Sequence, residues 1–137
     1  MRLLLAALPV LVLSACATPG SAPGSLSGTR WQADTVAGKA CTMPSTVEFL
    51  DAQRASGNLG CNRYTAVYEL DGTKLKFGPV SSTRKACAPD LMAQDAAFTK
   101  VLENTRGVRR DGNALTFYGA DDKALVKLTP EKPGECK

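Results

Sequence analysis

The chain has 137 residues, a formal net charge of +4 at pH 7, five cysteines and no histidine. Without an imidazole it cannot form a Ser-His-Asp or Cys-His catalytic group or a His-ligated metal site, which excludes much hydrolase and metal chemistry. The length allows one domain, and the charged fraction of 22% is ordinary for a globular protein. We therefore expect a single non-enzymatic domain with no metal and no cofactor.

Residues 1–15 have the pattern of an export signal. A positive start at Met1-Arg2 precedes an apolar run over residues 3–13, which is shorter than the roughly 20 residues that span a bilayer. The run ends in Leu13-Ser14-Ala15-Cys16, which matches a bacterial lipobox. Cleavage after Ala15 would make Cys16 the first residue and the lipidation site. The alternative is an ordinary signal peptide with an incidental cysteine.

The predicted partner of the amino terminus is a membrane, held through acyl chains such as palmitate on Cys16. Ala17 favours sorting to the outer membrane, facing the periplasm, because Asp at this position usually causes inner-membrane retention in bacteria with two membranes. Basic residues are scattered, and only Arg84-Lys85 and Arg109-Arg110 are adjacent. We therefore expect no nucleic-acid partner.

The rest of the chain divides by composition. Residues 16–28 are rich in Gly, Ser and Pro, so we expect a lipidated cysteine followed by a flexible tether. Residues 29–129 are expected to form the folded domain, and residues 130–137 a short carboxyl-terminal tail.

Short alternating segments separated by turn residues predict β-strands from Thr29 onward. Asp71-Gly72 predicts a hairpin, because this dipeptide favours the tight turn between antiparallel strands. The predicted strands are residues 29–36, 45–50, 64–70, 74–77, 108–110, 114–118 and 124–128.

One helix is predicted between the two groups of strands. Pro89 suits the first helical position, Asp90 lies in the first turn, and Gly107 follows the end. An apolar stripe at helical spacing is formed by Leu91, Phe98, Val101 and Leu102. The predicted fold class is α+β, with a strongly bent, partly closed antiparallel sheet of seven or eight strands packed on one α-helix.

Four cysteines remain after Cys16 is assigned to the lipid. An even number in an exported chain predicts two disulfides, and four cysteines allow three pairings. We favour Cys61–Cys87 together with Cys41–Cys136, because the second bridge would fasten the tail to the loop after the first strand. The cysteine spacing and the lack of histidine make a metal site a poor alternative.

Two segments carry a distinctive pattern, GxxGCNxYxxxY and TRxxC. The residues that make up these patterns are Gly57, Gly60, Cys61, Asn62, Tyr64, Tyr68, Thr83, Arg84 and Cys87. Together the segments resemble the META domain family, which includes HslJ-like heat-shock lipoproteins, and the resemblance extends over residues 29–129. Lys85-Ala86 and Thr65-Ala66 depart from residues that are common in the family. Cys41 and Cys136 lie outside the motif, so the family gives the second disulfide no support.

The resemblance implies a bent antiparallel sheet with one helix, a role in the bacterial envelope and no established catalytic activity. The leading hypothesis is a non-enzymatic envelope lipoprotein of the META/HslJ type. It would contribute to stress tolerance through contacts of a monomeric domain with an unidentified envelope protein or lipid. The alternative is a periplasmic inhibitor of a hydrolase such as lysozyme. The basic Arg84-Lys85 pair argues against a basic target, because like charges oppose encounter.

The motif residues also have a structural interpretation. Gly57 and Gly60 allow a sharp turn or a close backbone approach, and Asn62 can bond loop backbone with its amide. We favour a corner locked by Cys61 over a ligand-binding loop. The barrel interior decides between two kinds of function: a filled core favours surface contact, and an apolar cavity favours an acyl ligand.

Overall fold

The computed structural model describes residues 20–36, 39–40 and 43–131. The strands are β1 (Arg30–Ala33), β2 (Thr35–Val36), β3 (Lys39–Ala40), β4 (Thr46–Phe49), β5 (Arg54–Asn58), β6 (Arg63–Asp71), β7 (Lys74–Phe77), β8 (Ser81–Ser82), β9 (Gly107–Asp111), β10 (Ala114–Tyr118) and β11 (Ala124–Pro130). The helix α1 (Pro89–Asn104) lies between β8 and β9 in the chain.

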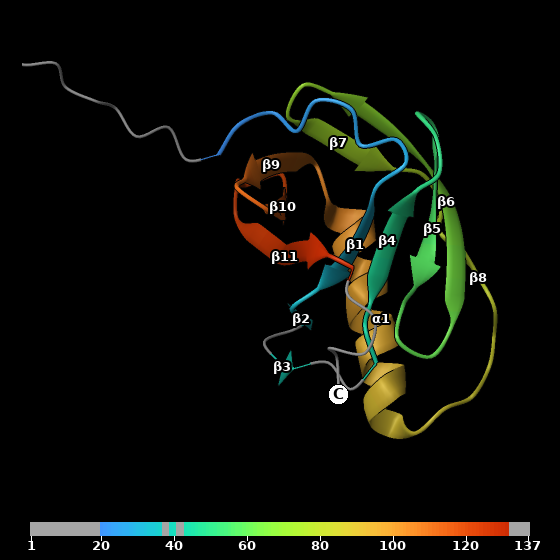
Figure 1. The fold of residues 1–137 in the computed structure, drawn as a ribbon. Coiled ribbons are helices and arrows are strands. Elements are labelled where there is room, and N and C mark those ends of the chain that lie inside the picture. The colour runs from blue at the N-terminus through green and yellow to red at the C-terminus, as the bar shows by residue number, and fades with distance from the viewer. Residues whose placement is uncertain (1–19, 37–38, 41–42, 132–137) are drawn as a thin grey trace, which may run out of the picture.

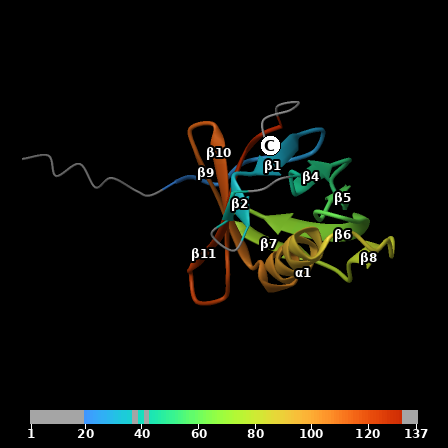
Figure 2. The same cartoon turned by 90° about the horizontal axis from the view of Figure 1, so that it is seen from below.

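Nine strands form one antiparallel sheet in the order β5-β4-β1-β11-β10-β9-β7-β6-β8. β5 also pairs with β6, so the sheet closes on itself into a barrel (Figure 1). The joint between β7 and β9 is the shortest of these pairings, with Lys74 opposite Gly107. Figure 2 shows α1 beside β6 and β7, away from the β9 to β11 strands. The predicted α+β class, with its bent and partly closed sheet on one helix, is confirmed.

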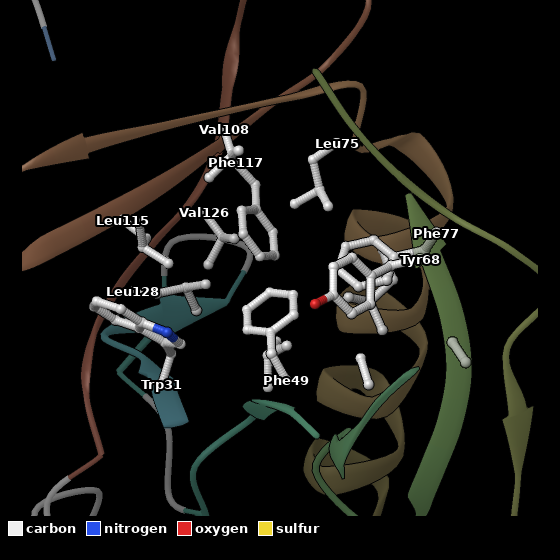
Figure 3. Packing of buried hydrophobic residues seen from close by; sticks show 14 of the residues in the cluster. Trp31, Phe49, Tyr68, Leu75, Phe77, Val108, Leu115, Phe117, Val126 and Leu128 are labelled. Atoms are coloured by element: carbon white, nitrogen blue, oxygen red, sulfur yellow. The ribbon is translucent and has the colours of Figure 1, made fainter. Parts of the chain in front are cut away.

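Aromatic side chains fill the interior of the barrel. Trp31, Phe49, Phe77, Phe98 and Phe117 are each at most 4% exposed. Figure 3 shows the rings of Phe49, Phe77 and Phe117 turned toward one another, and the Phe77 and Phe117 centroids are 5.7 Å apart. Of the two predicted outcomes for the interior, the filled core is the one observed.

α1 has most of the features that its sequence predicts, but Leu91 and Val101 of the predicted stripe are only half-buried, and Gly107 is the first residue of β9. Pro89 stands at its first turn with Asp90, and Phe98 and Leu102 are its buried residues. The hydroxyl of Thr105 donates to the carbonyl of Val101 at 2.7 Å, which satisfies one of the carbonyls left free at the end of the helix. In the described part of the chain, no helix has the length and apolar character needed to cross a membrane.

The strand β5 is absent from the predicted elements, because Gly57-Asn58 favours a turn or bulge. In the structure Gly57 lies opposite Tyr64 in a regular pairing of β5 with β6. The close approach that the glycine was expected to allow is present. A Cβ atom at position 57 would lie 2.1 Å from the carbonyl oxygen of Thr46 on β4.

The single strand predicted over residues 29–36 is wrong, because the chain leaves the main sheet at Asp34. β1 ends at Ala33, and β2 pairs with β3 in a separate two-stranded sheet. The N–H of Asp34 still donates to the carbonyl of Lys127 on β11 at 3.2 Å. Trp31 and Ala33 are buried as predicted.

The folded domain begins earlier than Thr29, because the second half of the predicted tether packs on the barrel. Ser21 and Arg110 exchange two backbone hydrogen bonds of 2.8 and 2.9 Å. Leu26 is 1% exposed and belongs to the core, and the N–H of Gly28 donates to the carbonyl of Phe49 at 2.7 Å. Residues 20–28 therefore cross one end of the barrel (Figure 1). The packing of these residues could not be predicted from composition, because a single leucine among Gly, Ser and Pro gives no periodic signal.

Replacing Gly57 with alanine is expected to lower the free energy of unfolding by about 1 to 3 kcal/mol, the usual cost of overpacking. The added Cβ would collide with the backbone of Thr46, so the two strands would have to separate. Urea unfolding of the domain measures the effect. Ser56→Ala, in the same strand, is the control and should leave stability nearly unchanged. Equal stability of the Gly57→Ala variant would contradict the close packing of β4 on β5.

Candidate functional site

The two motif segments meet at one corner of the barrel. The segment from Thr83 to Cys87, here called the motif loop, connects β8 to α1. It is joined to the turn after β5 by the Cys61–Cys87 disulfide, with 5.9 Å between the two Cα atoms. The structure thus contains one of the two predicted disulfides. Cys16, Cys41 and Cys136 lie outside the described residues.

Asn62 is the centre of this corner and is 5% exposed. Its side-chain oxygen accepts hydrogen bonds from the Lys85 N–H at 2.7 Å and from the Thr83 hydroxyl at 2.9 Å. Its amide nitrogen lies 3.4 Å from the Lys85 carbonyl, to which it donates. The predicted bonding of loop backbone by this amide is therefore present. One side chain fixes the path of the motif loop.

The helix is tied to the same corner by Asp95. One carboxylate oxygen of Asp95 accepts a hydrogen bond from the Asn62 N–H at 2.8 Å. Gly60 lets the helix approach, because a Cβ there would lie 3.1 Å from the Asp95 nitrogen and 3.2 Å from the Leu91 carbonyl oxygen. The turn, the motif loop and α1 are thus held together by the disulfide and by Asn62.

Sequence reasoning missed the contacts of two residues near this corner, Asp95 and Ser45. Asp95 lies three positions before the buried Phe98, so helical periodicity could have placed it at the edge of the inward face. Ser45 is fully buried, and its hydroxyl donates to the Leu59 carbonyl at 2.7 Å while accepting from Gln94 at 3.0 Å. No local pattern indicates this second contact, because its partners lie far apart in the chain.

The two motif tyrosines support the barrel wall and do not line the corner. The Tyr64 hydroxyl donates to the Thr46 carbonyl at 2.8 Å, and the Tyr68 hydroxyl donates to the Asp51 carbonyl. Burial raises the pKa of Tyr64 far above its usual range. Burial, and then the charge of Asp51, raises the pKa of Tyr68. Both hydroxyls are therefore held protonated as donors to strand and loop backbone.

Alkaline pH should unfold the domain through these tyrosines. A raised folded-state pKa means that folding favours the neutral hydroxyl, so stability is unaffected below the unfolded pKa of about 10 and falls as the pH rises above it. The tyrosinate absorbance of Tyr64, isolated by comparison with Tyr64→Phe, should appear only together with loss of the far-ultraviolet circular dichroism signal. Ionisation of Tyr64 in a folded domain would contradict this burial.

The motif loop presents two cationic side chains to solvent. Arg84 and Lys85 are exposed, and neither side chain has a hydrogen-bond or ion-pair partner within the described residues. Arg63 on the neighbouring strand is also exposed. Of the polar motif side chains, Arg84 is therefore the one without a hydrogen-bond or ion-pair partner in the described residues.

The outer wall of the barrel carries a separate hollow. A surface depression of about 500 Å³ lies against β6 and β7, where Val67 is 58% exposed. Its other lining residues are Gln53, Tyr68, Glu69, Lys76, Phe77, Gly78 and Pro79. The depression is open to solvent, and its lining includes Tyr68 and Phe77, which also belong to the aromatic core. Its lining includes Tyr68 of the motif residues but none of those at the corner.

The motif residues thus fall into three groups. Gly60, Cys61, Asn62, Thr83 and Cys87 build the corner, while Gly57, Tyr64 and Tyr68 support the barrel wall. Arg84 forms the third group, because its exposed side chain supports neither the corner nor the wall. No cluster of three or more His, Cys, Asp or Glu side chains suited to a metal ion occurs in the described ranges.

Comparison with known proteins gives a family match and two similar folds. A family model, the META domain, matches residues 24–132. An NMR structure of a protein from Burkholderia xenovorans is 27% identical, with a TM-score of 0.59, 78% of this chain covered and 84% of that chain covered. Another NMR structure is 24% identical, with a TM-score of 0.61, and covers 77% of this chain and 91% of that chain. No curated protein matches.

Proposed function

This chain belongs to the META domain family, and from that premise we propose that it is a non-enzymatic lipoprotein of the bacterial envelope. It would contribute to envelope stress tolerance by contact between its surface and an envelope protein. The membrane would hold it through acyl chains on Cys16, in the outer membrane and facing the periplasm.

The observation that carries this proposal is the filled barrel. Small barrels bind ligands inside when their interior side chains leave a cavity. Here Phe49, Phe98 and Phe117 are fully buried in the interior. An acyl chain inside the barrel would have to displace these rings, so the packing favours binding on the outer surface.

The motif loop is the surface best prepared for a partner. Its backbone is fixed by Asn62 and by the Cys61–Cys87 disulfide, so binding would cost little ordering of the loop. Arg84 and Lys85 stand on this loop with exposed side chains. Two adjacent cations without internal partners favour an acidic protein surface, since complementary charge speeds encounter and selects partners.

The polar groups of the motif other than the Arg84 guanidinium have structural partners, which supports a non-enzymatic role. The Asn62 amide is engaged by the motif loop, and the Tyr64 hydroxyl donates to strand backbone. Cys61 and Cys87 are joined in the disulfide and cannot act as thiolate nucleophiles. The full chain contains no histidine that could serve as a base.

Anchoring and stress tolerance are tested together in a bacterial strain that lacks its own copy of the gene. The wild-type chain should carry the acyl mass on Cys16, fractionate with the outer membrane and restore survival after heat or detergent stress. The Cys16→Ser variant should lack the acyl mass, leave the membrane fraction and restore survival poorly. A wild-type chain without acyl mass would overturn the anchoring, and full rescue by Cys16→Ser would overturn its importance.

Two binding assays with the purified domain test the surface-contact mechanism. We expect no saturable binding of a fluorescent fatty acid and no inhibition of lysozyme. Fatty-acid binding at one molecule per barrel would show that the core opens for a ligand. Tight, stoichiometric lysozyme inhibition would replace the proposal with a hydrolase inhibitor.

A further inference from the structure

The described chain starts beside β9, at the end of the barrel that carries the β9–β10 hairpin. Ser21 exchanges backbone hydrogen bonds with Arg110, and a Cβ on Gly20 would lie 3.0 Å from the Cβ of Arg109. In Figures 1 and 2 this start, in blue, lies on the β9 side of the molecule. The amino-terminal segment therefore enters the domain at one defined place.

Little chain separates this place from the predicted lipid. Gly20 is four residues after Cys16 in the sequence. At no more than about 3.6 Å per residue, four residues span at most about 14 Å. The pairing of Ser21 thus replaces the predicted twelve-residue tether with a much shorter connection.

The opposite end of the domain lies beyond that reach. α1 has 16 residues, and its carboxyl end leads through Thr105 and Arg106 into β9. At 1.5 Å per residue the helix is about 24 Å long. Its amino end, next to the motif loop, lies away from the start of the described chain (Figure 1). A connection of about 14 Å attached at β9 keeps the β9 end of the domain close to the membrane surface.

The end near the anchor offers a group suited to phospholipid. Arg110 is exposed, and its guanidinium lies 5.7 Å from the Trp31 ring centroid, which supports the side chain from one side. A guanidinium binds phosphate through paired N–H donors. Asn113, in the exposed turn that follows, lies at the tip of the same hairpin.

We propose that the β9–β10 hairpin faces the phospholipid headgroups of the membrane that holds Cys16, and that the Ser21–Arg110 pairing sets this orientation. The inference rests on the proposed lipidation of Cys16. It places the motif loop at the end of the domain that points away from the membrane, where Arg84 and Lys85 are open to a partner.

The orientation is measured on the mature lipoprotein in vesicles of phosphatidylethanolamine and phosphatidylglycerol. Asn113→Cys places a fluorophore on the hairpin, and Ala93→Cys places one on the exposed side of α1 as the matched control. Labelling without reductant leaves the disulfide intact. Lipids with a nitroxide on the headgroup should quench the label at position 113 several-fold more than the label at position 93. Equal or reversed quenching would overturn the proposed orientation.

Two proline substitutions test whether the Ser21–Arg110 backbone pairing orients the domain. Ser21→Pro removes the N–H that donates to Arg110, whereas Ala22→Pro removes one that takes no part in this pairing. Ser21→Pro should reduce the difference in quenching between the labels at positions 113 and 93, and Ala22→Pro should preserve this difference. An unchanged difference in a folded Ser21→Pro protein would show that the pairing does not orient the domain. The intact mass of each sample distinguishes loss of orientation from loss of the lipid itself.

Discussion

Replacing both Cys61 and Cys87 with alanine is expected to lower the free energy of unfolding by about 3.5 kcal/mol, from the loop-entropy relation. The disulfide closes a sequence separation of 26 residues, which includes β6, β7 and β8. In the unfolded chain the bond restricts this long segment. In the folded chain Asn62 holds the motif loop in the same place, so the native structure should survive the loss of the bond.

Urea unfolding of the wild-type and doubly substituted domains measures this change. Ala86→Ser is the matched control, because it alters an exposed residue of the same loop without touching the bond. A loss of less than about 1 kcal/mol would contradict the prediction and point to residual structure in the unfolded chain.

Phe49→Ala is expected to cost about 3 to 5 kcal/mol, the usual range for removing a fully buried ring. Phe49 is 0% exposed and lies in the middle of the barrel. Its ring centroid lies 4.9 Å from that of Tyr68 and 6.4 Å from that of Phe77, so its loss would leave two rings without their neighbour. The cost measures how tightly the interior is packed.

The matched control is Phe49→Leu, which keeps most of the apolar volume and should cost less than the alanine variant. Thermal and urea unfolding provide the measurement. A domain that tolerates Phe49→Ala without loss of stability would have a loosely filled interior. Binding on the outer surface would then lose its support from the filled core.

The regular elements were predictable because their local signals agree with their tertiary environment. The Asp71-Gly72 turn joins β6 and β7 as predicted, with Asp71 opposite Lys74. β6 alternates buried and exposed residues along much of its length, which is the pattern visible in the sequence. The helix was marked at its start by Pro89 and along its buried face by Phe98 and Leu102.

The missed elements depend on contacts between distant segments. β5 has the sequence RASGN, with no β-branched or aromatic residue, and its pairing with β6 depends on the space that Gly57 leaves for Thr46. Residues 20–28 fold onto the barrel through Leu26 and the backbone of Ser21. Backbone pairing of this kind leaves no mark in composition or periodicity.

The candidate site was predictable only in part, because some of its contacts have a local sequence signal and others depend on the tertiary fold. The even number of cysteines allowed three pairings, and Cys61–Cys87 was preferred among them because the remaining bridge would fasten the carboxyl-terminal tail. The amide of Asn62 was expected to bond loop backbone, and it does. The contact of Asp95 with this corner required the helix to be placed against Gly60, which depends on the tertiary fold.

Stress survival with the charge of the motif loop reversed tests the proposed partner surface most directly. Arg84→Glu combined with Lys85→Glu should abolish rescue of the deletion strain, while the protein stays folded, lipidated and bound to the membrane. Lys76→Glu combined with Lys127→Glu makes the same change in net charge at exposed positions elsewhere and should rescue normally. If the motif-loop variant protects cells as well as the wild type does, the motif loop is not the partner surface.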